Sequence, residues 1–193
     1  MDFSARRSIY GLGKDIPLSK EEVEDLIKHA ILNSPSAFNS QTARVVLLWG
    51  KESDQLWDIV EQELRKVVPA ENFSSTKDKL SAFRAGAGTI LFFEESTTVR
   101  GLQEQFPLYA DNCPVWALEG GGMVQFAVWT LLADKKIGAS LQHYHPLISE
   151  AVARQWNIPQ TWQLRAQMPF GSIKAPAAEK NVMPVSERFK IFA

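Results

Sequence analysis

The fold is indicated by Pro35-Ser36-Ala37-Phe38-Asn39-Ser40-Gln41, read together with the earlier stretch Arg6-Arg7-Ser8. The longer stretch joins a rigid proline to hydroxyl and amide side chains, which can pair with donors and acceptors on the edge of a heterocycle. The same residue types are common in turns that end helices, so the two interpretations are evenly balanced. The arginines and serine of the shorter stretch suit a phosphate group, because a guanidinium can bind two of its oxygens. Taken alone, that stretch is more simply a solvated basic terminus, since exposed arginines are common.

An amphipathic helix is predicted between the two stretches. Ser19 followed by Glu22 has the spacing of a capping box, in which each side chain accepts a hydrogen bond from the other residue's backbone amide. Apolar residues then recur at helical spacing and form one face: Val23, Leu26, Ile27, Ala30 and Ile31. The helix should end near Pro35, because proline disfavours helical geometry in the residue before it.

The remainder of the chain alternates helices irregularly with few strands. Apolar runs predict buried strands over residues 44–49, 89–93 and 163–168, and a short extended piece over 138–142. Three further helices are expected: one capped by Ser53 and reaching Val68, one across residues 123–133, and one from Pro146 toward Trp156. This order predicts one α+β domain over residues 1–193. Residues from about 174 to 193 are rich in proline, alanine and charge, and are expected to form an extended C-terminal arm.

Composition narrows the class of protein. The chain has 193 residues, 45% of them hydrophobic, and a formal net charge of −1. A chain of this length can bury a sizeable core, and the balanced charge argues against a broad nucleic-acid surface. The single cysteine fits a reducing compartment, and no apolar run of a signal peptide follows the charged N-terminus, so a cytoplasmic location is expected. The apolar run over residues 115–133 contains Glu119 and three glycines, which favours a buried core helix over a membrane span.

In order and spacing, the two opening stretches resemble the FMN-dependent nitroreductase family, in which an Arg-x-Ser precedes a first helix and a Pro-Ser-x-x-Asn-x-Gln loop follows it. Further similarities to the small fatty-acid-repression-mutant-like branch of that family extend along nearly the whole chain. They lie in residues 83–93, 127–130, 138–144, 179–184 and 187–188. The resemblance implies a central, mainly antiparallel sheet flanked by helices, and a C-terminal arm exchanged between the chains of a homodimer.

The resemblance also implies an FMN at the dimer interface, held by residues from both chains. Arg6 and Ser8 would address its phosphate and ribityl end, and Lys180 or Arg188 would add positive charge from the arm. The loop of the second chain would supply Pro35, Ser36 and Asn39, and Gln41 of the same stretch is also counted among the cofactor-binding residues. The segment placed against the flavin would be Leu141, Gln142 and His143.

The chain departs from the family pattern at two places. Many members carry a lysine shortly after the Arg-x-Ser, near the polar edge of the flavin ring, and Tyr10 stands there in this chain. Arg7 is the candidate for the missing charge and is therefore counted among the cofactor-binding residues. Gln41, which many members follow with Pro-Trp, is followed here by Thr42 and Ala43.

The implied activity is that of an FMN-dependent NAD(P)H oxidoreductase. NAD(P)H and a nitroaromatic or quinone-like acceptor would use one flavin face in turn and give ping-pong kinetics, since no Gly-x-Gly-x-x-Gly pattern follows a strand to hold a dinucleotide separately. No side chain is assigned a catalytic role, because the cofactor carries the chemistry. The alternative is a flavin-binding regulatory or sensing dimer, linked to a lipid or stress response, in which reductase activity is incidental.

Three other groups of residues each have two interpretations. Phe106, Tyr109 and Trp116 are candidates for an aromatic roof over the substrate, although such side chains more often belong to the core. The paired histidines His143 and His145 have no third ligand at metal spacing, so a hydrogen-bonded loop pair is preferred and no metal is expected. Cys113 lacks a base partner and is expected to be buried and inert.

Overall fold

The computed structural model describes residues 3–192 and is built around a five-stranded sheet. The strands are β1 (Leu12–Gly13), β2 (Ala43–Trp49), β3 (Gly88–Glu95), β4 (Ile137–Ala139) and β5 (Trp162–Ile173). They run in the order β1-β5-β3-β2, with β4 also paired to β5, and every one of these pairings is antiparallel. The predicted α+β fold with a mainly antiparallel sheet is therefore confirmed.

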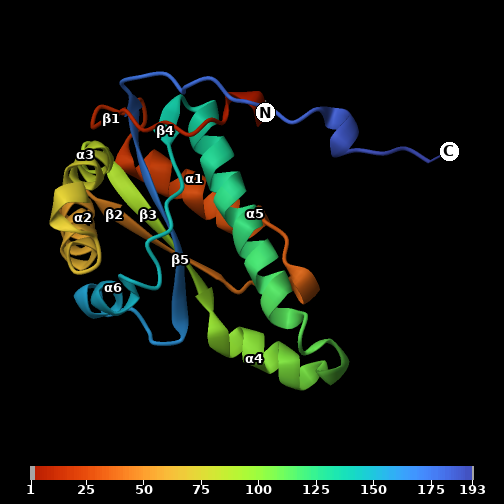
Figure 1. Cartoon of the computed structure of the whole chain (residues 1–193). Helices are drawn as coiled ribbons and strands as arrows, with labels where there is room; N and C mark the ends of the chain where they lie inside the picture. The colour runs from red at the N-terminus through yellow and green to blue at the C-terminus, as the bar shows by residue number, and fades with distance from the viewer. Residues whose placement is uncertain (1–2, 193) are drawn as a thin grey trace.

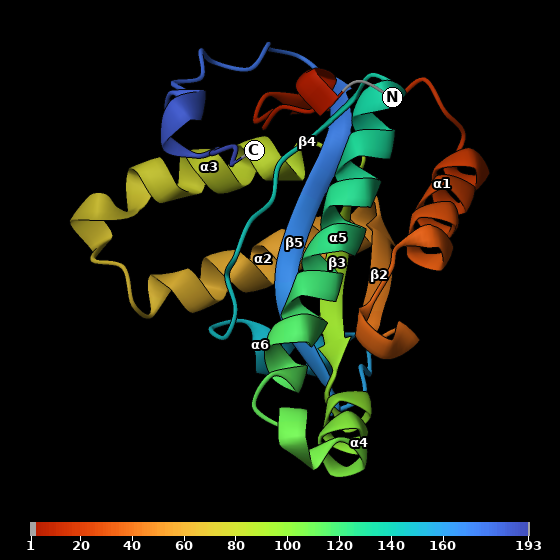
Figure 2. The same cartoon turned by 90° about the vertical axis from the view of Figure 1, so that its right-hand side faces the viewer.

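Helices cover both faces of the sheet (Figures 1 and 2). One face is covered by α1 (Lys20–Asn33) and the long α5 (Cys113–Asp134). The other face is covered by α2 (Lys51–Arg65), α3 (Phe73–Arg84) and α6 (Ser149–Gln155). The remaining helix, α4 (Ser96–Gln105), continues from the end of β3 and leads through the short η4 (Pro107–Tyr109) into α5.

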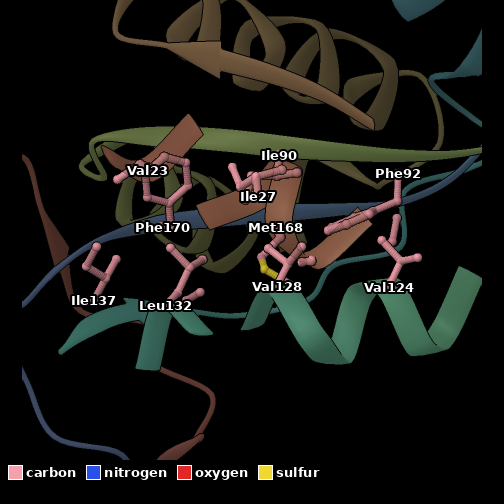
Figure 3. Packing of buried hydrophobic residues seen from close by; sticks show 13 residues of the cluster. Val23, Ile27, Ile90, Phe92, Val124, Val128, Leu132, Ile137, Met168 and Phe170 are labelled. Carbon is pink, nitrogen blue, oxygen red and sulfur yellow. The ribbon is translucent and has the colours of Figure 1, made fainter. Parts of the chain in front are cut away.

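The core lies on both sides of β3, which is buried along its whole length. Its alternating side chains supply two apolar clusters: Ile90 and Phe92 face α1 and α5, whereas Leu91 and Phe93 face α2, α3 and α6. Figure 3 shows the first cluster, in which side chains of α5 pack against β3 and β5. Burial of this kind stabilises a fold by about 1.5–3 kcal/mol for each large apolar side chain.

Local signals in the sequence correctly placed the first helix. Glu22 donates its backbone N–H to Ser19 Oγ at 3.2 Å, and Ser19 donates to Glu22 Oε2 at 2.8 Å, which completes the predicted capping box. The predicted cap of α2 is wrong, because Gly50 holds that position at a φ of 50°. Ser53 is instead buried, with its Oγ 2.7 Å from Thr89 Oγ1 on β3.

Other boundaries also differ from the sequence prediction. Helices α3 and α4 were not predicted, α5 begins ten residues before Met123, and α6 begins at Ser149, three residues after Pro146. The triple glycine of α5 meets a neighbouring segment at one of its three positions. Gly120 does lie against Ser36, but a Cβ at Gly121 or Gly122 would meet no atom of the described residues within 4 Å.

Helix α5 presents one buried face and one exposed apolar face. Among residues 3–192 it is the one helix long and apolar enough to cross a membrane, and a third of that apolar stretch is buried inside the fold. The prediction of a buried core helix applies to the face that meets the sheet. The opposite face exposes four large apolar side chains: Val115, Leu118, Met123 and Phe126.

Glu95 fixes the start of α4. Its carboxylate accepts hydrogen bonds from the backbone N–H groups of Thr97 at 3.1 Å and Thr98 at 2.6 Å, and from the Thr98 hydroxyl at 2.8 Å. Burial alone raises the pKa of this carboxyl, but the hydrogen bonds from Thr98, Thr161 and Thr97 outweigh burial and lower the pKa from 4.5 to about 2.

We expect Glu95→Gln to destabilise the protein by about 1 kcal/mol at pH 7, because the amide replaces a charged helix cap. The folded-state pKa lies below the unfolded one, so this contribution is fully present above pH 4.5 and is lost as the pH falls toward 2. Urea unfolding at pH 7 and pH 3 measures the difference. If Glu95→Gln loses the same free energy of unfolding at both pH values, the negative charge of Glu95 does not cause the stabilisation.

Candidate functional site

A cavity of about 560 Å³ lies between the N-terminal segment and the start of the C-terminal arm. The N-terminal side contributes Arg6, Arg7, Ser8, Tyr10 and Gly11, and the arm contributes residues 175–181. Ser8 forms a parallel bridge with Ala139 of β4, and Ile9 donates its N–H to the Ala139 carbonyl at 2.9 Å. These backbone bonds hold the N-terminal segment against the edge of the sheet, although the segment itself contains little regular structure.

The cavity carries an excess of positive charge. Arg6, Arg7 and Lys180 line it, and among the described residues Glu179 is the one carboxylate that does so. The Arg6 guanidinium lies 4.4 Å from the ring centroid of Trp129 on α5, and Arg7 donates to the Ala178 carbonyl of the arm. Guanidinium, ammonium and hydroxyl groups are donors that match a phosphate, so the lining fits the phosphate end of a nucleotide-like cofactor.

The other cation predicted for the arm lies elsewhere. Arg188 is exposed and caps the short η5 (Val185–Glu187), beyond the residues that line the cavity. The arm beyond residue 181 leaves the body of the molecule (Figure 1). Apolar side chains dominate its exposed surface, and Phe192 is 91% exposed. Such a segment has no core of its own within one chain.

The loop over residues 35–41 has a left-handed backbone at three positions that are not glycine. The φ angles of Phe38, Asn39 and Gln41 are 54°, 51° and 50°. Ser36 holds the loop together, because its carbonyl accepts from Asn39 N–H at 2.9 Å and its Oγ accepts from Gln41 N–H at 2.9 Å. Non-glycine residues with positive φ cluster at ligand sites and switch regions, where the surrounding structure fixes them.

Pro35, Ser36 and Gln41 also line a separate cavity of about 330 Å³, which is bounded by α1, β2 and the middle of α5. Asn39 is exposed and does not line it. Within one chain this loop is remote from the positively charged cavity. Ser36 lies against Gly120, and Arg6 lies over Trp129, nine residues farther along α5 and therefore about 13 Å away along the helix axis.

The three aromatic residues predicted to form a substrate roof lie in one cluster. The Tyr109 and Trp116 ring centroids are 5.9 Å apart, and Phe38 connects Trp116 to Phe106. Phe38 stacks on Phe106 with centroids 4.4 Å apart and planes 14° from parallel. The sequence prediction omitted Phe38, although its position inside the polar stretch of residues 35–41 was a signal that an aromatic ring belongs there.

The segment expected to face a flavin follows β4. Leu141 is half-buried and packs on the core, while Gln142 is buried and exchanges two backbone hydrogen bonds with Gln167 of β5. The Gln142 side-chain amide donates to Ser140 Oγ at 3.1 Å, so this side chain is fixed. His143 is exposed at the end of the segment.

The two predicted histidines lie close together after β4. The rings of His143 and His145 lie 6.0 Å apart, and His145 Nδ1 is buried without a hydrogen-bond partner among residues 3–192. Burial, and then His143 and Arg165, lower the pKa of His145. No group of three potential metal ligands occurs within those residues. Cys113 is buried, as predicted, and its Sγ donates to the Tyr109 carbonyl.

One polar pair near the site was missed. Arg165 is the extra residue of a β-bulge, because Phe92 pairs with Ala166 whereas Phe93 pairs with Leu164. The Arg165 side chain donates to Glu94 Oε1 at 3.0 Å, and both residues line a small pocket with Ala117 and Gln125 of α5. No sequence signal distinguished this bulge from continuous pairing.

Comparison with known proteins agrees with the fold. The model of the nitroreductase family matches residues 3–172. The nitroreductase FRM2 of Saccharomyces cerevisiae is 30% identical over 178 residues, which cover 91% of this chain and 88% of that protein. Structures of the nitroreductase CinD from Lactococcus lactis, one with chloramphenicol and one with 4-nitrophenol, are both 48% identical. Each covers 99% of this chain and 97% of its own, with TM-scores of 0.91 and 0.90.

A more distant protein from Desulfovibrio desulfuricans, whose structure contains FMN, shares the fold at 16% identity. It covers 98% of this chain and 95% of its own, with a TM-score of 0.72. The family model spans most of the chain, and the relatives match it over nearly their whole length. The chain therefore belongs to the nitroreductase family.

Proposed function

We propose that this chain is an FMN-dependent NAD(P)H oxidoreductase of the cytoplasm that reduces nitroaromatic or quinone-like acceptors, with residues 1–193 as one FMN-binding domain. The observation that carries the proposal is the cavity lined by Arg6, Arg7, Ser8 and Lys180. Its donors and positive charge suit a flavin phosphate, and the family to which the chain belongs carries out flavin-dependent reduction of nitro compounds. The FMN in the Desulfovibrio desulfuricans structure is consistent with this cofactor.

Each side chain of the cavity has a specific task in this proposal. Arg6 and Lys180 would hold the phosphate, and Ser8 would donate to the phosphate or ribityl oxygens. Arg7 would hold the arm over the cofactor through its bond to the Ala178 carbonyl. The extended segment of Leu141, Gln142 and His143 begins two residues after the Ala139 partner of Ser8 and leads away from the phosphate end. Four residues of extended chain span about 13 Å, so His143 would lie beside the flavin ring.

We further propose that two chains complete each site. None of Pro35, Ser36, Asn39 and Gln41 lines the positively charged cavity of its own chain, and these residues would reach the flavin of a second copy. The exposed apolar face of α5 and the exposed apolar side chains of the arm would form the interface between the copies. The arm, including Arg188, would then pack on the other chain.

Bound FMN would accept hydride from NAD(P)H and pass electrons to the acceptor. The protein would bind both partners in turn on one open face. CinD has been solved with chloramphenicol, 4-nitrophenol and nicotinic acid, of which the first two carry nitro groups and the third carries a pyridine ring. These ligands of a relative support the proposal that flat aromatic molecules bind to this chain. The aromatic cluster around Trp116 would provide the matching surface here.

Initial-rate kinetics test this function. Purified protein should be yellow and should oxidise NADH or NADPH in the presence of a nitroaromatic acceptor. Double-reciprocal plots at several acceptor concentrations should be parallel, because one surface binds the two substrates alternately. Intersecting lines would mean that both substrates bind at once. A colourless protein without turnover would contradict the proposal that the chain binds FMN.

A further inference from the structure

Phe38 has a backbone conformation that its side chain disfavours. Its φ of 54° lies in the left-handed region, where a bulky L-residue meets steric conflict that glycine avoids and asparagine tolerates. The neighbouring Asn39, at a φ of 51°, is a residue type suited to that region. A glycine or asparagine at position 38 would satisfy the backbone, so the phenyl ring at this position calls for another explanation.

The ring is held from one side and open on the other. Phe106, at the junction of α4 and η4, stacks on Phe38 nearly in parallel, at 4.4 Å and 14°. Trp116 of α5 approaches at 5.8 Å with its plane tilted by 56°. Phe38 nevertheless remains 54% exposed. Three segments of the chain therefore fix an aromatic face in position without burying it.

Packing within one chain does not account for this arrangement. A side chain that only anchored the loop to its own chain would be covered by its partners there, and leucine would supply the same apolar contact. The electron-rich faces of Phe and Trp rings attract flat rings that lack electron density, and parallel offset stacking is a preferred geometry. The ring also stands next to Asn39, which the proposed function places beside the flavin.

We propose that Phe38 determines acceptor specificity: its strained backbone projects a ring, supported by Phe106 and Trp116, on which flat, electron-poor aromatic acceptors stack. This inference rests on the proposed function and adds the residue that selects among acceptors. An acceptor without an aromatic ring gains nothing from the stack. Phe38 would therefore act on the preference between acceptor classes rather than on electron transfer itself.

Two substitutions separate the ring from the backbone strain. Phe38→Leu keeps the strained backbone and the apolar bulk but removes the aromatic face, whereas Phe38→Gly removes both the ring and the strain. Phe38→Tyr retains the face and should restore wild-type behaviour. Leu108→Ala is the matched control, because Leu108 is an 85% exposed apolar residue on η4 and is not part of the aromatic cluster.

The measurement compares two acceptors with the same NAD(P)H donor and the FMN-loaded protein. The acceptors are 4-nitrobenzoate, which is flat and aromatic, and ferricyanide, which is neither. We expect the ratio of kcat/KM for 4-nitrobenzoate to that for ferricyanide to fall about tenfold in both Phe38→Leu and Phe38→Gly, chiefly through the KM of the aromatic acceptor. Quenching of tryptophan fluorescence by 4-nitrobenzoate should give a matching loss in affinity without turnover.

The possible outcomes are distinct. A fall in both activities by the same factor would show that Phe38 only supports the loop, and an unchanged ratio would show that the ring contacts no acceptor. Either result overturns the proposal while leaving the oxidoreductase function intact. Wild-type protein that reduces neither acceptor would contradict the proposed function itself. In that case the quenching of tryptophan fluorescence still tests the stacking surface: the same affinity for 4-nitrobenzoate in wild type and Phe38→Leu would reject it.

Discussion

Arg6→Ala should weaken FMN binding about tenfold to hundredfold and leave the fold intact. The guanidinium lines the positively charged cavity and is oriented by Trp129, and charge-assisted hydrogen bonds to a phosphate contribute about 1.5–3 kcal/mol each. FMN titration of the apoprotein by fluorescence quenching measures the change. The lost contact with Trp129 should lower the free energy of unfolding by no more than about 1 kcal/mol.

Three further arginine and lysine variants sharpen this result. Arg154→Ala removes the same charge from an exposed site on α6 and should leave the FMN affinity unchanged. Lys180→Ala should weaken binding more than Arg188→Ala, because Lys180 lines the cavity of its own chain and Arg188 does not. Equal affinities for wild type and Arg6→Ala would place the phosphate elsewhere.

Removal of residues 182–193 should weaken the proposed homodimer at least a hundredfold. This part of the arm contains apolar side chains that are exposed in the single chain: Val182, Met183, Val185, Phe189, Ile191 and Phe192. Full burial of one such side chain contributes about 1.5–3 kcal/mol, so partial burial of several exceeds the roughly 3 kcal/mol of a hundredfold change. Sedimentation equilibrium across nanomolar to micromolar concentrations measures the dissociation constant.

The truncation leaves the cavity lining at residues 175–181 in place, apart from the new terminus at Asn181. FMN should therefore be lost together with the dimer, at the same protein concentration. Lys190→Ala, on the exposed arm, provides a control that should dimerise normally. A truncated protein that remains dimeric at nanomolar concentration would mean that α5 alone forms the interface.

Local chemistry made parts of the fold predictable. The capping box of Ser19 and Glu22 satisfies backbone amides within one helical turn, so the signal lies in four residues. The strands at β2 and β3 are continuous apolar runs because both faces of the sheet are covered. Helix α3 was missed because only Phe73, Leu80 and Phe83 of its twelve residues are buried, which leaves little apolar periodicity.

The candidate site was predictable to a different degree. Arg6 and Ser8 are separated from Lys180 by more than 170 positions, and only the family resemblance assigned the three residues to one site. The structure shows that these three residues line one cavity. The left-handed φ of Phe38 could not be predicted, because bulky residues are rare in that region. The bulge at Arg165 depends on pairing between distant strands, which a single sequence does not encode locally.

The central claim is that each FMN site is built from two chains. Arg6→Ala/Ser8→Ala removes the phosphate side, and Ser36→Ala/Asn39→Ala removes the loop side. Homodimers of either variant should bind FMN weakly.

A heterodimer, purified with two different affinity tags, should contain one site with both halves intact and one site lacking both. We expect it to bind one FMN per dimer with wild-type affinity. Weak binding at both sites of the heterodimer would show that the two groups act within the same chain and would contradict the account.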